Sequence, residues 1–197
     1  MNVRILVLLL VVLGATSTFG QTGQAQPTPE PGACALKPSQ LDAVLNLSFL
    51  QFDQDQAGGW RELQSKGCDL AAAMLIDSYI VDAPEELKLI HLEDLYFHAG
   101  QLYAWAGLKK VAARRFLRSL NLHERGDEDL AWNPYVLATI AFLHGDREEL
   151  AHQRQLLTSA KATRENKINL SVVDGLVKCF DKPYGEAYDL GCRVPVK

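Results

Sequence analysis

Between Trp60 and Tyr79, apolar and small residues recur every three or four positions, which is the spacing of one face of an α-helix. This stripe can form one long helix that ends before Pro84, or two short helices that turn at Gly67. Either arrangement makes the segment helical. The residues of the stripe are Trp60, Leu63, Gly67, Leu70, Ala71, Met74, Leu75, Ser78 and Tyr79.

The rest of the chain favours helices as well. No alternating apolar and polar stretch is long enough to indicate a strand, so the pattern predicts an all-α fold. One further helix is expected from Pro38 to about Gln51, and another from just after Pro84 to about Gly107. Four more are expected at 108–120, 129–144, 146–160 and 168–180.

The start of the chain predicts its compartment. Arg4 is followed by the uninterrupted apolar run Ile5 to Leu13 and then by small and polar residues, which is the layout of a secretory signal peptide. The run is shorter than the roughly 20 apolar residues that span a bilayer. We therefore expect residues 1–20 to be a signal peptide, with cleavage after Gly20 or Ala25, and an exported protein, periplasmic or secreted, without a membrane anchor.

The mature chain divides into a tether and a helical domain. Residues 21–33 are rich in Gln, Thr, Pro and Gly and show no apolar period, which indicates a flexible tether before a single domain at 34–197. Removing residues 1–20 takes one base from the 20 Lys and Arg and leaves 19 against 24 acids, a net charge of −5. That balance argues against a nucleic-acid partner, because no basic surface stands out to neutralise phosphates.

Four cysteines in an exported chain favour disulfides, because the compartment is oxidising. Cys34, Cys68, Cys179 and Cys192 contain no Cys-x-x-Cys step, so zinc binding and thiol exchange are not indicated. Three pairings are open. The local one, Cys34 with Cys68 and Cys179 with Cys192, places one bridge at each end of the domain.

A set of residues around Gly107 carries the clearest family resemblance. Over about 27 residues, the aromatic, small, turn and aromatic positions have the spacing of the tetratricopeptide repeat, in which two antiparallel helices pack together. The chain resembles that family, and Trp132 to Leu143 is similar to stretches of exported bacterial repeat proteins. The matching residues are Tyr96, Gly100, Tyr103, Gly107, Ala112, Phe116 and Ser119.

Neighbouring segments match less closely. Gly67 lies 40 residues before Gly107 and Gly145 lies 38 after it, so the period exceeds the usual 34 residues. The resemblance implies stacked antiparallel helix pairs in a right-handed superhelix, and the local cysteine pairing adds a disulfide at each end. It also implies that the first helix of each pair lines a concave surface.

That concave surface is the expected partner site. The resemblance places on it Asp94, Phe97, Gln101 and Trp105 from one helix and Trp132, Tyr135 and Thr139 from the next. Aromatic side chains flanked by polar groups are good anchors for a peptide. The alternative is that these aromatics pack in the core between neighbouring pairs.

Residue types that bind metal or catalyse reactions occur without a complete motif. The segment from Asp53 to Gly58 begins like a calcium loop, but Ala57 lacks a ligand oxygen and Gln64 stands at the position of the bidentate Glu. His91 and His98 can share a helix face, without the spacing of a known zinc motif. No nucleophile elbow or phosphate loop is present. We expect no metal, no cofactor and no catalysis.

Three functions are compatible with these observations. The first is an exported scaffold that binds a protein or peptide partner. The second is a periplasmic inhibitor or immunity protein that blocks a cognate enzyme, suggested by small size, acidic charge and disulfides. The third is an enzyme. The sequence favours the first, with the partner's identity open.

Overall fold

The computed structural model describes residues 32, 34–82, 85–121 and 130–195, without the side chains of residues 85–91. The predicted signal peptide and all of the tether except Gly32 lie outside these residues. Within them, every regular element is a helix. The elements are α1 Pro38–Leu45, η1 Leu50–Gln54, α2 Gly59–Ser65, α3 Asp69–Asp82, α4 Glu85–Trp105, α5 Lys109–Arg118, α6 Trp132–His144, α7 Arg147–Ser159, α8 Arg164–Lys178 and α9 Tyr184–Tyr188.

The all-α prediction is confirmed for the described residues, and several helix limits are corrected. α1 ends at Leu45, earlier than expected, because the Asn46 side chain donates to the Asp42 carbonyl and the chain then turns into the π-helical η1. α8 begins before Ile168 because the Thr163 hydroxyl accepts the Asn166 N–H and caps the helix. α9 was not predicted at all.

Glycines end the first helix of three successive pairs in the same way. Gly67, Gly107 and Gly145 have φ of 76°, 79° and 74°, a region that costs little only for glycine. Each glycine N–H donates three residues back, and the next N–H donates five residues back. This Schellman arrangement turns the chain between α2 and α3, α4 and α5, and α6 and α7. The two-helix alternative for residues 60–79 is therefore the correct one.

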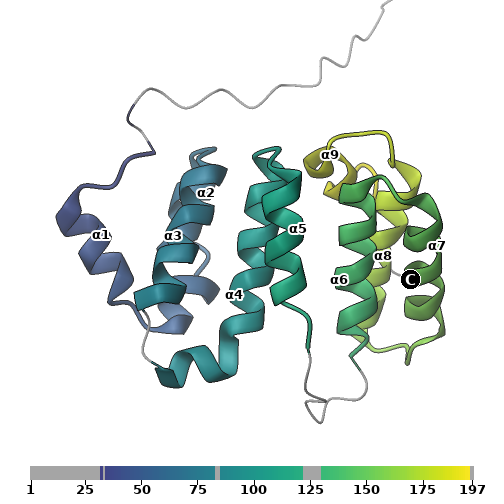
Figure 1. The fold of residues 1–197 in the computed structure, drawn as a ribbon, viewed down its shortest axis with the longest axis horizontal. Helices are drawn as coiled ribbons and strands as arrows, with labels where there is room; N and C mark the ends of the chain where they lie inside the picture. The colour runs from purple at the N-terminus through teal and green to yellow at the C-terminus, as the bar shows by residue number, and fades with distance from the viewer. Residues whose placement is uncertain (1–31, 33, 83–84, 122–129, 196–197) are drawn as a thin grey trace, which may run out of the picture.

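From η1 to α9 each helix packs against the next along the chain, whereas α1 contacts α3. α9 also contacts α4, and in Figure 1 it lies beside the ends of α5 and α6. One hydrophobic core joins α2 to α9. The α4–α5 pair meets at Gly100, where an added Cβ would lie 2.9 Å from the Phe116 ring. A small residue is required there so that the aromatic ring fills the space beside it.

Ala112, on the facing helix, is completely buried and gives a test of this pairing. We predict that Ala112→Leu overpacks the pair and lowers the free energy of unfolding by roughly 1–3 kcal/mol. Lys109→Leu, at the exposed first position of the same helix, should change it by less than about 0.5 kcal/mol. Urea unfolding measures both values. Equal effects of the two variants would show that α4 and α5 are not packed as described.

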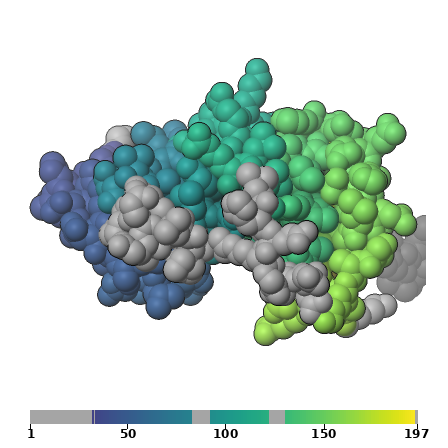
Figure 2. Space-filling model, turned by 60° about the horizontal axis from the view of Figure 1, so that its bottom comes forward, coloured from purple at the N-terminus to yellow at the C-terminus, as the bar shows by residue number. Residues whose placement is uncertain are grey.

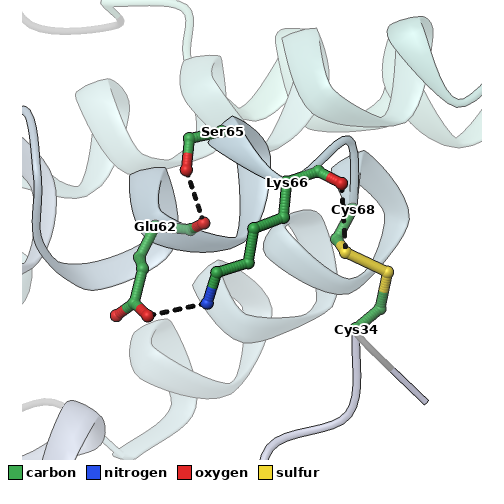
Figure 3. The surroundings of a disulfide bond; sticks show 5 residues. All are labelled: Cys34, Glu62, Ser65, Lys66 and Cys68. Carbon is green, nitrogen blue, oxygen red and sulfur yellow. Dashed lines mark hydrogen bonds and ion pairs between the residues drawn. A yellow bond between two sulfur atoms is a disulfide. The ribbon is translucent and has the colours of Figure 1, made fainter. Parts of the chain in front are cut away.

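The local cysteine pairing is confirmed. Cys34 is bonded to Cys68, with Cα atoms 5.4 Å apart, and Cys179 to Cys192, with Cα atoms 6.1 Å apart. The first bridge ties the start of the domain to the α2–α3 turn, beside the exposed Lys66–Glu62 ion pair (Figure 3). The second holds the segment that contains α9 against the end of α8. Both ends of the domain are covalently fastened.

We predict that reduction lowers the free energy of unfolding by about 3 kcal/mol for each bridge, because the unfolded chain regains the entropy of the opened loop. The measurement is the melting temperature with and without reductant, accompanied by a thiol count. Two or more reactive thiols in the folded, unreduced protein would contradict the bridging.

Candidate functional site

The residues predicted to line a concave partner surface are mostly in the core. Phe97, Gln101, Tyr135 and Thr139 are 5%, 6%, 3% and 1% exposed, so their assignment to an accessible surface is corrected. Asp94, Trp105 and Trp132 are half-buried.

The burial follows from how α4 packs on α6. The Phe97 ring lies 4.8 Å from the Trp132 ring and 5.3 Å from the Tyr135 ring, centre to centre. The Thr139 hydroxyl donates to the Tyr135 carbonyl within α6, and the Trp132 indole donates to the Ser119 carbonyl at 2.7 Å. These aromatics therefore join helix pairs, which is the alternative that the sequence left open.

The short helix α9 covers the remaining part of the predicted surface. Trp105 lies 5.5 Å from Tyr188 and 6.1 Å from Tyr184, between ring centres. A Cβ added at Gly185 would lie 2.8 Å from the Trp105 ring, so the α9 backbone lies directly on the indole. Tyr184 is 2% exposed. The C-terminal segment of the chain thus covers the part of the predicted surface around Trp105.

The tyrosines of this region are held neutral. Burial, followed by the nearby Tyr188 hydroxyl, raises the pKa of Tyr135 well above its usual value. Burial also raises the pKa of Tyr184, and the Gln101 side chain and Arg193 only partly oppose the rise. Neither phenol loses its proton near neutral pH, so both act as packed, uncharged groups.

A second cluster surrounds Asp53, a carboxylate with no exposed surface. It accepts hydrogen bonds from the Trp60 indole at 2.9 Å and the Gln54 amide at 2.6 Å, and it pairs with His98 Nδ1 at 2.8 Å. Gly59 makes this possible: its φ is +53°, and a Cβ there would lie 1.9 Å from the Phe52 carbonyl oxygen. The close packing of η1 on α2 thus places the Asp53 carboxylate in contact with His98 of α4.

The electrostatics of the cluster favour the charged carboxylate. Burial alone would raise the pKa of Asp53, but the His98 and Trp60 hydrogen bonds and the charge of Arg61 lower it below its usual value. Arg61 is held in turn: its Nε donates to the Asp53 carbonyl at 2.9 Å, and its guanidinium lies 4.1 Å from the Trp60 ring centre. The cluster fastens η1 and α2 to α4.

This geometry bears on the metal sites weighed in the sequence. The Asp53 carboxylate that would begin a calcium loop is already occupied by three donors of the protein. His98 meets Asp53, and the His91 side chain lies outside the described residues. Among the residues described, no group of three or more His, Cys, Asp or Glu side chains is placed to hold a metal ion.

A third cluster is the basic surface of α5. The net charge of the chain predicted no such surface. Half of its ten residues are cations and none is acidic. Lys110, Arg114, Leu117 and Arg118 follow the spacing of one helix face and are all exposed. Figure 2 shows this part of the chain at the outer edge of the molecule. We call Lys110, Arg114, Leu117 and Arg118 the α5 basic face. The signal was visible in the sequence as five bases within ten residues, at positions 109, 110, 114, 115 and 118.

The cations of α5 differ in their partners. Arg115 pairs with Asp77 at 2.8 Å, and Arg118 donates to the Tyr96 hydroxyl at 3.0 Å. Burial and a hydrogen bond to Asp77 raise the pKa of Tyr103, beside this pair, to about 12. Lys110 and Arg114 form no ion pair with any carboxylate among the described residues.

Comparison with protein-family models, with curated proteins and with solved structures finds no match to this chain. In the described part of the chain, no helix combines the length and the apolar character needed to cross a bilayer.

Proposed function

We propose that this protein is an exported, non-catalytic scaffold that binds a protein or peptide partner through the outer surface of tetratricopeptide-like helix pairs. The observation that carries the proposal is the threefold repetition of one turn geometry, at Gly67, Gly107 and Gly145. Stacked helix pairs of this kind present long, regular surfaces, and such surfaces serve mainly for binding other macromolecules.

Two features support the proposal that the protein is exported. Both ends of the domain carry a disulfide, and disulfides persist in oxidising compartments. The sequence before Cys34 has the layout of a signal peptide and a tether, which would leave the folded domain free of the membrane.

The absence of catalysis is part of the proposal. The most reactive arrangement in the described residues is the Asp53–His98 pair, and its geometry favours a structural role. The described residues place no hydroxyl or thiol in hydrogen-bond contact with His98, whereas a histidine base in covalent catalysis bonds to its nucleophile.

The test is photo-crosslinking in the exported fraction of the source cells. A crosslinking residue at an exposed helix position should yield one or a few discrete adducts that co-purify with the native protein. Adducts with peptides or with a subunit of an envelope assembly support the scaffold. A single folded enzyme, bound in equal amounts and losing activity, would replace it with the inhibitor function. Absence of any adduct from all exposed helices would contradict both.

A further inference from the structure

The charges of α5 destabilise the helix, and no contact in the described residues compensates for Lys110 and Arg114. Lys109 and Lys110 occupy the first turn, where the helix dipole disfavours positive charge, and that turn holds no acid. Lys110 with Arg114, and Arg114 with Arg118, are like charges four residues apart, which destabilises a helix further. Violations of this kind in natural proteins concentrate at functional sites.

The face also combines charge with apolar surface. Leu117 is 50% exposed beside Arg114, and Leu108 is 40% exposed at the start of the helix. The chain as a whole is acidic, with a net charge of −4, so the α5 basic face is a local positive surface on a molecule that otherwise repels anions. A partner must therefore be acidic and compact enough to meet α5 without meeting the acids of the neighbouring α3, Asp69, Asp77 and Asp82.

We propose that the α5 basic face is a docking surface for an acidic, leucine-bearing helical segment of a partner protein. Carboxylates of that segment pair with Lys110 and Arg114, and its apolar side chains cover Leu117. This is recognition by an amphipathic helix, in which charge sets the orientation and apolar contact supplies affinity. The inference rests on the proposed scaffold function and names the partner's chemistry.

The surface does not suit an extended polyanion as well. The face is a single helix of ten residues, whereas nucleic acid and membranes present negative charge over much longer distances. Such a surface would also approach the acidic α3, which Asp77 links directly to α5 through Arg115. The exposed Leu117 has no counterpart in a phosphate backbone.

The experiment uses the mature protein with both disulfides and a synthetic amphipathic helix that carries glutamates beside a stripe of leucines. We expect binding that weakens as salt is raised. Replacing every glutamate of the peptide by glutamine should weaken it at least about tenfold, and so should the double variant Lys110→Glu and Arg114→Glu. Lys110→Glu puts an acid in the first turn of α5, where the dipole favours it, so the variant should stay folded. Circular dichroism checks this.

The matched control is Lys37→Glu with Arg164→Glu, which makes the same change of charge at two exposed sites outside α5. The control should bind the peptide like the native protein. Equal binding by all three proteins would overturn the proposal, and so would tighter, α5-dependent binding of phosphatidylglycerol vesicles or single-stranded DNA. A crosslinked natural partner that still binds the α5 variant would leave the scaffold standing and refute only this inference. Finding no partner at all would refute both.

Discussion

Replacing Asp53 by alanine is expected to lower the free energy of unfolding by about 3–5 kcal/mol, the largest effect of any polar substitution in this protein. The carboxylate is completely buried and serves three donors from three parts of the chain. Its removal leaves the buried Trp60 indole without an acceptor, and it takes the shared partner from His98 on α4 and from the exposed Gln54 amide. Urea unfolding gives the value.

The control is Asp42→Ala, an exposed acid on α1, which should cost less than about 0.5 kcal/mol. The pH dependence adds a second readout. Because the pKa of Asp53 is lowered on folding from the usual 3.8, its stabilisation is fully present above that pH and is lost as the pH falls further through the folded pKa. Asp53→Ala should lack this component of acid unfolding. A loss below about 1 kcal/mol would show that the cluster does not hold η1 to α4.

Truncating Tyr184 to alanine is expected to cost about 3–5 kcal/mol, as for other large buried aromatics. Tyr184 anchors α9 to α4, α5 and α6, through ring contacts with Trp105, Phe116 and Phe142. Its loss should also free Trp105 from the α9 backbone and shift the tryptophan emission to longer wavelength. Thermal or urea unfolding together with fluorescence measures both effects.

Tyr184→Phe keeps the ring and removes only the hydroxyl, so it should cost no more than about 1 kcal/mol. The binding of the acidic peptide should be unchanged in both variants when they are measured under folded conditions, because Tyr184 contacts α5 at the buried Phe116, whereas Lys110 and Arg114 are exposed. Unchanged stability in Tyr184→Ala would mean that α9 is not docked and that the surface beside Trp105 is open to a partner.

The sequence predicts the helices and the turns well because these depend on local chemistry. Gly67, Gly107 and Gly145 each stand where the chain adopts positive φ, and a single glycine in the sequence is enough to indicate such a turn. The Cys179–Cys192 pairing likewise joins neighbours in sequence, 13 residues apart. α9 escaped prediction because its five residues are helical only through their packing on α4 and α8.

The site was harder to predict, because periodicity does not distinguish a buried aromatic from an exposed one. Phe97 and Tyr135 lie on the expected helix faces, but those faces meet each other and α9 instead of solvent. The Asp53–His98 pair joins residues 45 apart, and no local pattern reports such a contact. The α5 basic face was legible, but a net charge taken over the whole chain conceals a local cluster.

The most direct test of the proposed α5 docking surface is amide hydrogen exchange of the mature protein with and without a bound partner segment, either the natural one or the acidic amphipathic peptide. We predict new protection within residues 108–118 and unchanged exchange in α4 around Gln101 and in α9. Protection confined to α4, α6 or α9, with none in α5, would contradict it and return the binding site to the surface that the C-terminal segment covers.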